Sequence, residues 1–93
     1  MTITRINQFE ARWDREEKSY EFLQSVLPMI KSSAGCKSCQ LFRSIDNPAQ
    51  FVMIEEWESV DAQQKAERSI PPDKMMQAMS LFRGLPKGTN YSA

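Results

Sequence analysis

Histidine is absent from this chain of 93 residues. It is the usual general base of enzymes that work near neutral pH and the commonest metal ligand in proteins. Its absence excludes serine–histidine and cysteine–histidine hydrolase sites built within the chain. A tetrahedral zinc site is also disfavoured, because the two cysteines supply only half of the ligands. We therefore expect no metal centre.

Glycine is scarce, with three residues at positions 35, 84 and 88. A phosphate-binding loop or a dinucleotide-binding fingerprint needs several closely spaced glycines, so that the backbone can approach the phosphates. The sequence contains neither pattern. We therefore expect no nucleotide cofactor, and no cofactor of any other kind is indicated.

Long apolar runs are also missing, since none approaches the roughly 20 residues that span a bilayer. The N-terminal part has several acidic side chains and no apolar segment of the signal-peptide type. Twelve basic side chains balance twelve acidic ones, so no global field attracts nucleic acid or an anionic membrane. We expect a single cytoplasmic domain over residues 1–93 that binds neither. A domain this small gains burial from a second subunit, so we expect a homodimer.

The two cysteines, Cys36 and Cys39, lie three positions apart in a segment with β-strand character. Side chains alternate between the two faces of a strand, so positions i and i+3 point in opposite directions. We predict that the two thiols face opposite ways, and a disulfide between them would need the strand to bend. A redox pair is disfavoured too, because reactive pairs usually sit at a helix N-terminus.

The N-terminal third of the chain predicts a strand followed by a helix. The segment Ile3–Arg12 is β-prone, with apolar residues on both faces. Asp14 is placed to cap a helix that starts near Arg15, because an acidic residue, Glu17, follows three positions later as in a capping box. Pro28 interrupts the apolar stripe of this helix and predicts a kink or a 3₁₀-like final stretch.

The middle of the chain predicts a β-hairpin. Two β-prone segments, Cys36–Ser44 and Phe51–Trp57, flank the turn sequence Asp46-Asn47-Pro48. Asp and Asn side chains bond their own backbone two residues on, and proline fixes φ, so the chain reverses there. Ser59 or Asp61 is then placed to cap a second helix, which prolines stop after about Arg68.

The C-terminal third predicts a further helix and a last strand. The helix starts at Asp73, and Gly84 is placed as its C-terminal cap. The segment Leu85–Tyr91 follows as an edge strand. The predicted order is β-α-β-β-α-(α)-β, the ferredoxin-like split βαβ arrangement of the α+β class, with an antiparallel sheet. Three apolar residues share one face of the third helix: Met75, Met79 and Phe82.

Several of these segments together resemble the antibiotic biosynthesis monooxygenase family, which includes small cofactor-independent quinol monooxygenases. The resemblance implies a dimeric α/β-barrel, in which the open sheet face of one subunit packs on its partner's. It also implies a cavity between sheet and helices for an activated aromatic substrate, which reacts with dioxygen without a cofactor. The residues that carry the resemblance are Val26-Leu27-Pro28, Gly35-Cys36, Gln40-Leu41, Arg43-Ser44, Asp46-Asn47-Pro48, Phe51-Val52, Ile54-Glu55, Trp57 and Ser59.

The same resemblance implies roles for an asparagine and a tryptophan, and Arg43 is a further candidate by its own chemistry. Asn7 is placed to hydrogen-bond a substrate oxygen or peroxide, Trp57 to stack on an aromatic ligand, and Arg43 to stabilise a developing phenolate. Each also has a structural alternative: a polar strand-edge residue for Asn7, core or dimer packing for Trp57, and a surface ion pair for Arg43. The remaining pocket residues are predicted to be Phe9, Met53, Met75, Met79 and Phe82.

The chain departs from the family in the region 63–73, where many members carry a histidine and this sequence has none. Haem degradation through that histidine is therefore disfavoured. A general base has to come from the substrate's own acidity or from one of four side chains. We predict a cofactor-independent monooxygenase of a small aromatic or quinol-like compound; a non-catalytic ligand-binding dimer and an isomerase with the same cavity stay open. The candidate bases are Glu55, Asp73, Tyr20 and Tyr91.

Overall fold

Four antiparallel strands form one sheet in the spatial order β2-β3-β1-β4. The computed structural model describes residues 2–93 and shows the predicted order of elements, which confirms the ferredoxin-like α+β fold. The last strand lies at an edge of the sheet, as expected. The elements are β1 (Ile3–Glu10), α1 (Glu16–Lys31), β2 (Cys36–Arg43), β3 (Gln50–Trp57), α2 (Val60–Arg68), α3 (Pro72–Leu81) and β4 (Lys87–Ser92).

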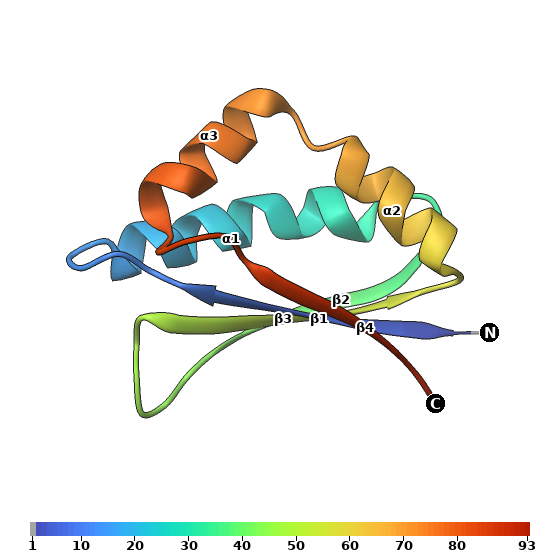
Figure 1. Ribbon diagram of the computed structural model, residues 1–93, viewed down its shortest axis with the longest axis horizontal. Coiled ribbons are helices and arrows are strands. Elements are labelled where there is room, and N and C mark those ends of the chain that lie inside the picture. The colour runs from blue at the N-terminus through green and yellow to red at the C-terminus, as the bar shows by residue number, and fades with distance from the viewer. Residues whose placement is uncertain (1) are drawn as a thin grey trace.

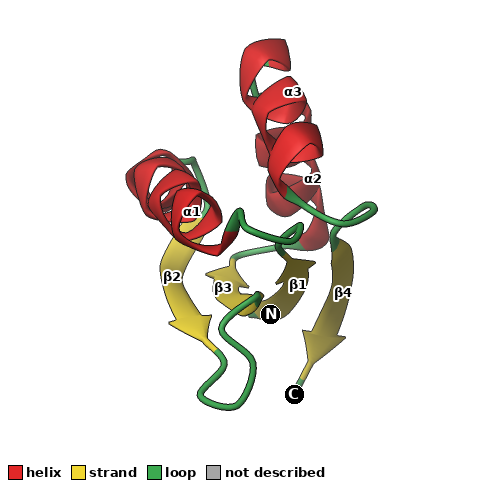
Figure 2. Cartoon of the chain, turned by 90° about the vertical axis from the view of Figure 1, so that its left-hand side faces the viewer, coloured by secondary structure: helices red, strands yellow, loops and turns green. Residues whose placement is uncertain are grey.

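All three helices lie on one side of the sheet, as Figures 1 and 2 show. Alternate residues of β3 face them, so every second side chain of this strand is buried. The other face of the sheet carries no helix in Figure 1. Within residues 2–93, no helix is long and apolar enough to cross a membrane.

The hydrophobic core fills the space between the sheet and the helices. Leu23 of α1 is almost completely buried, and Phe82 contacts both Phe9 and Phe22 with ring centroids 5.2 and 6.1 Å apart. The buried core residues are Ala11, Leu23, Cys39, Phe51, Met53, Leu81 and Phe82.

The start of α1 differs from the prediction. Asp14 has a φ of 63°, in the left-handed region, so it lies in a turn and does not cap the helix. Arg15 occupies the N-cap position and makes no side-chain capping bond. The sequence pattern is misleading here, because Asp is favoured both at N-caps and at left-handed turn positions.

The end of α1 agrees with the prediction in part. The helix runs through Pro28 to Lys31, and the Ser33 N–H donates to the Ile30 carbonyl at 3.1 Å. That i to i−3 bond is the 3₁₀-like closing turn that the proline predicts. In the hairpin that follows, Asn47 Oδ1 accepts from the Ala49 N–H at 3.1 Å, as the turn sequence indicates. Ser59 caps α2 by accepting the Ala62 N–H at 3.1 Å.

The end of α3 is a correction. The helix begins at Pro72 and ends at Leu81, so Gly84 does not cap it. Phe82 has extended backbone angles and bridges Ala11, and the Arg83 N–H donates to the Glu10 carbonyl at 2.7 Å. Phe82 therefore lies just after the helix, where it packs in the core next to the sheet. It does not share a helix face with Met75 and Met79.

The two cysteines lie on the same face of β2, which contradicts the prediction. Cys36 pairs with Trp57 and Cys39 with Glu55, and those two β3 residues face the helices together. A register shift between Cys36 and Ser38 inserts one extra residue into the strand. Such a bulge reverses the alternation that follows it, so positions i and i+3 face the same way.

Gly35 connects α1 to β2 and has a φ of 85°. A Cβ at this position would lie 2.6 Å from the Ala62 Cβ of α2. We expect Gly35→Ala to lower the free energy of unfolding by about 2 kcal/mol or more, through backbone strain and overpacking. Gly84 has a φ of 69° with no atom within 4 Å of an added Cβ. Gly84→Ala therefore measures the backbone strain alone, and we expect it to lower the free energy of unfolding by about 1 kcal/mol. Equal losses in urea unfolding would contradict the steric part of the prediction.

Candidate functional site: a buried carboxylate between sheet and helices

Glu55 is the one carboxylate of β3 that faces the helices, and only 4% of its surface is exposed. Side chains alternate between the two faces of a strand, so Glu55 faces the helices together with Met53 and Trp57, which lie two residues before and after it. Both of these neighbours are buried too. A buried carboxylate is costly unless hydrogen bonds satisfy its oxygens. The surroundings of Glu55 provide these bonds.

Each oxygen of the Glu55 carboxylate accepts one hydrogen bond. Asn7 Nδ2 of β1 donates to Oε2 at 2.8 Å, and Trp57 Nε1 donates to Oε1 at 2.8 Å. The structure thus joins two residues that the sequence analysis singles out, and it places them on one of the four candidate bases. The arrangement fixes the orientation of the carboxylate, because its two oxygens are held from different directions.

Burial raises the pKa of Glu55 above its ordinary value of 4.5. The hydrogen bond from Trp57, the positive charge of Arg5 and the hydrogen bond from Asn7 act in the opposite direction, in that order of size. A carboxylate whose pKa is raised is a stronger base than an exposed one. It is therefore better matched to taking a proton near neutral pH.

The surroundings of the two thiols beside Glu55 disfavour their reactive thiolate forms. Burial, followed by the negative charge of Glu55, raises the pKa of Cys39 to about 12. Burial also raises the pKa of Cys36, with Glu55 again the second cause. Both cysteines are free and, with these shifts, protonated at neutral pH. Among residues 2–93, no group of three or more histidine, cysteine, aspartate or glutamate side chains is placed to hold a metal ion.

The raised pKa of Glu55 predicts a pH dependence of stability. Because the folded state favours the protonated carboxyl, this stabilisation is complete below the ordinary pKa and is lost as the pH rises through the raised one. We expect the free energy of unfolding of the wild type, relative to Glu55→Gln, to fall over that range. Urea unfolding of both proteins at a series of pH values measures the difference, and the common contributions of other groups cancel. A difference independent of pH would contradict the prediction.

Arg43 does not join this cluster. Its guanidinium donates to the Glu17 carboxylate and to the Pro48 carbonyl, the latter at 2.8 Å, and lies over the rings of Tyr20 and Phe51. Its strand partner is Phe51, four residues before Glu55 and thus roughly 13 Å away along β3. The ion pair that the sequence analysis gives as the structural alternative is the arrangement observed for Arg43.

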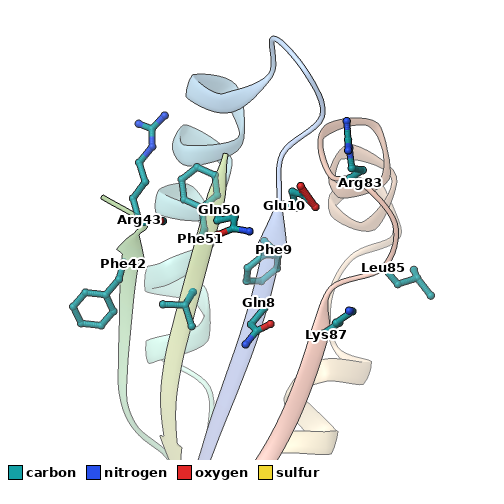
Figure 3. Close-up of a pocket in the computed structure, with 12 residues that line it drawn as sticks. Gln8, Phe9, Glu10, Phe42, Arg43, Gln50, Phe51, Arg83, Leu85 and Lys87 are labelled. Carbon is teal, nitrogen blue, oxygen red and sulfur yellow. The ribbon is translucent and has the colours of Figure 1, made fainter. Parts of the chain in front are cut away.

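Arg43 and Phe9 instead line an open cleft at one end of the sheet, with a volume of about 450 Å³. Figure 3 shows Phe9 and Phe51 on the two middle strands, with Arg43 on one side and Arg83 on the other. The cleft does not include Asn7, Glu55 or Trp57 among its lining residues. The cleft is large enough for a small ligand, but it lacks converging polar contacts of the kind that surround Glu55.

The other predicted pocket residues are distributed over core and surface. Met53 is buried and pairs with Asn7 across the sheet, so it lies next to the cluster. Phe82 is a core residue. Met75 and Met79 are more than half exposed on α3, so they do not form an apolar wall together with Phe82.

Two polar residues near Glu55 escaped the sequence analysis. Arg5 lies directly across from Glu55 in the β1–β3 register, and Asn90 lies across from Arg5 on β4. The only available signal was the alternation of β1, which places Arg5 and Asn7 on one face. The placement of Arg5 beside Glu55, and of Asn90 beside Arg5, depends on the strand order, which the sequence does not encode locally.

Comparisons with known proteins agree with this fold. A sequence profile of the family described as antibiotic biosynthesis monooxygenase matches residues 2–79. The chain belongs to this family. No curated protein matches the chain at a significant level. The matched range includes Asn7, Glu55 and Trp57 and ends before β4 begins at Lys87.

Solved structures with this fold include proteins with and without a stated activity. Rv0793 from Mycobacterium tuberculosis superimposes with a TM-score of 0.86 at 21% identity, covering 100% of this chain and 95% of its own. PA3566 from Pseudomonas aeruginosa superimposes with a TM-score of 0.84 at 18% sequence identity, covering 99% of this chain and 93% of its own. A mutant of SnoaB, a cofactor-independent oxygenase from Streptomyces nogalater, superimposes with a TM-score of 0.82 at 17% sequence identity. The match covers 99% of this chain and 92% of the SnoaB chain. At these identities the likeness concerns the fold.

Proposed function

We propose that the chain is a cofactor-independent monooxygenase of a small aromatic, quinol-like compound. The observation that carries the proposal is the buried Glu55 carboxylate, held by Asn7 and Trp57 between sheet and helices in a chain of this family. SnoaB, which shares the fold, is a cofactor-independent oxygenase. The proposal gives each of the three residues a chemical role.

Glu55 takes the proton of a substrate hydroxyl, and Asn7 and Trp57 orient the carboxylate for this step. The proton passes to Glu55, and the electron pair of the O–H bond remains on the substrate as an electron-rich phenolate. That anion passes electrons to dioxygen. A C–H bond of the substrate is replaced by a C–O bond, the product is at the oxidation level of a quinone, and the second oxygen atom leaves as water with the proton held by Glu55 and one further substrate proton. The substrate supplies all four electrons, so the balance needs no other reductant. The protein's contribution is to bind, to favour the anion and to exclude water.

The assembly that we propose is a homodimer through the open sheet face. Ile6, Val52 and Ile54 on this face are half-buried in the single chain, and Phe42 and Tyr91 are about half exposed. An apolar face of this kind on a sheet without helices is typical of a surface covered by a second subunit. A partner sheet packed there leaves the helix-covered side, with Glu55, to the substrate.

Light scattering should give a mass of about twice the 10.8 kDa of the chain. We expect Ile54→Lys to shift the protein to the monomer, because the dimer would have to bury an unpaired charge at the centre of the face. Met76→Lys, on the exposed side of α3, serves as the matched control and should leave the mass unchanged. A wild-type monomer at micromolar concentration would contradict the proposed assembly.

Oxygen uptake tests the reaction. The purified, metal-stripped protein is given a panel of hydroquinones and anthrones, and each rate is compared with the autoxidation rate of the same compound. We expect protein-dependent oxygen consumption and an oxygenated product that carries one atom from labelled dioxygen. Binding detected by tryptophan fluorescence without any acceleration would refute the enzymatic proposal and favour a ligand-binding dimer.

A further inference from the structure

Arg5 is a positive charge built into the same cluster as Glu55. It lies on β1 between Glu55 on β3 and Asn90 on β4, because it pairs with both in the sheet register. Its Nη1 donates to Asn90 Oδ1 at 3.0 Å, and its Nη2 lies 3.9 Å from Glu67 Oε1 of α2. At 3.9 Å, Arg5 and Glu67 form an ion pair, but the two atoms are too far apart for a hydrogen bond. Nη2 donates no hydrogen bond within residues 2–93, so this nitrogen can donate to a ligand.

Gly88 makes room for this arrangement. It lies on β4 opposite Asn7, and its φ is outside the left-handed region, so backbone conformation does not require glycine here. A Cβ at Gly88 would lie 2.2 Å from Arg5 Nη2 and 2.5 Å from Asn7 Oδ1. The guanidinium of Arg5 and the amide of Asn7 thus both lie against the backbone of Gly88, in a space that any larger residue would fill.

The exposure of Arg5 is suited to binding. Its side chain is 15% exposed, which is enough for contact with a ligand and little enough for solvent screening to be weak. The guanidinium is fixed by Asn90, so little side-chain entropy is lost when it donates a further hydrogen bond. Arg43, in contrast, already donates to Glu17 and to the Pro48 carbonyl.

We propose that Arg5 binds the ionised oxygen of the aromatic substrate beside Asn7, and that Gly88 and Asn90 of β4 position it for this purpose. The inference rests on the proposed function and assigns the specificity for a phenolate to Arg5. It also gives the C-terminal strand, which lies beyond the range matched by the family profile, a part in the site.

The charge balance of the site supports this assignment. Before proton transfer the buried negative charge is on Glu55, opposite Arg5 in the sheet. The step converts a phenol and a carboxylate into a phenolate and a carboxylic acid, so the negative charge moves to the substrate while the total stays constant. Arg5 faces both positions and compensates the charge in each state. The other groups around Glu55 are Asn7, Trp57, Glu67, Cys36 and Cys39.

Anaerobic binding of 4-nitrophenol tests the inference without turnover. This chromogenic phenol reports its own ionisation by absorbance. With the wild type we expect binding of the phenolate form and a lower apparent pKa of the bound phenol than of the free one. Arg5→Met should weaken phenolate binding about 10- to 100-fold, as expected for the loss of a charge-assisted hydrogen bond. Arg5→Lys should restore part of the affinity and of the pKa change.

Gly88→Ala provides a second test that keeps both Arg5 and Asn7. The added methyl must displace the guanidinium and the amide, so phenolate binding should weaken although no polar group is removed. It also keeps the inference testable if Arg5→Met does not fold, because the extended strand accepts alanine. Arg68→Met, an exposed arginine of α2, is the matched control and should bind as the wild type does.

The outcomes separate this inference from the proposed function. Loss of phenolate binding in Arg5→Met and Gly88→Ala supports the role of Arg5 even if the wild type consumes no oxygen. Wild-type binding in both folded variants overturns it, even if oxygen uptake is present. No binding of 4-nitrophenolate to the wild type also overturns it. A loss in Arg43→Met without a loss in Arg5→Met would assign the phenolate to Arg43 instead.

Discussion

Replacing Glu55 with glutamine should lower the protein-dependent rate of oxygen consumption by about 10²- to 10⁴-fold, the usual contribution of a positioned general base. Glutamine keeps the size of the side chain and removes the ability to take a proton. The carboxylate of Glu55 accepts two hydrogen bonds, whereas the amide of glutamine has one accepting oxygen and one donating NH₂ group. Either Asn7 or Trp57 therefore loses its acceptor. Stopped-flow or electrode measurements with the best substrate of the panel give the rate.

The matched control is Glu56→Gln. Glu56 is the next residue of β3, has the same chemistry and is exposed on the opposite face of the sheet, where it accepts from Ser38 Oγ at 3.2 Å. We expect its rate to equal that of the wild type. The pH profile adds a second criterion, since the wild-type rate should rise with deprotonation of a carboxyl group and the Glu55→Gln rate should not. An unchanged rate in a folded Glu55→Gln protein would exclude Glu55 as the base.

The largest effect on stability is expected from Phe82→Ala. Phe82 is 2% exposed, packs against Phe9 and Phe22, and lies in the bridge that ties the end of α3 to the sheet. Truncation of a buried phenylalanine leaves a cavity and typically costs about 3–5 kcal/mol. Urea unfolding measures the change. Phe82→Leu, which fills most of the volume, should cost about 1.5 kcal/mol or less.

Met79→Ala is the control for this experiment, because the two residues are predicted from sequence to share a helix face. Met79 is 64% exposed in the single chain, so its truncation should change the free energy of unfolding by no more than about 0.5 kcal/mol. Similar losses for both residues would mean that α3 packs with Met79 inward. The contrast therefore tests the position of α3 as well as the role of Phe82.

The cluster around Glu55 illustrates how far sequence alone leads to a site. Asn7 and Trp57 were candidates, and Glu55 was one of four possible bases, but nothing local links them. Asn7 and Glu55 are 48 residues apart in the chain. Their contact follows from the pairing of β1 with β3, which places them on one face at neighbouring register positions. Arg5 entered the site through the same pairing.

The sequence by itself determined the order of the elements, the hairpin, Ser59 as one of two candidate caps of α2, the family and the absence of histidine chemistry. These features depend on local signals, such as turn residues, capping side chains and short-range periodicity.

Only the tertiary structure decided which carboxylate is held, where Arg43 pairs, and which way Cys36, Phe82 and the α3 methionines face. Those outcomes depend on a bulge, on the strand register and on where a helix ends against the core. Each is set by contacts between segments that are distant in sequence, because the free energy of burial is shared among all the elements that meet there.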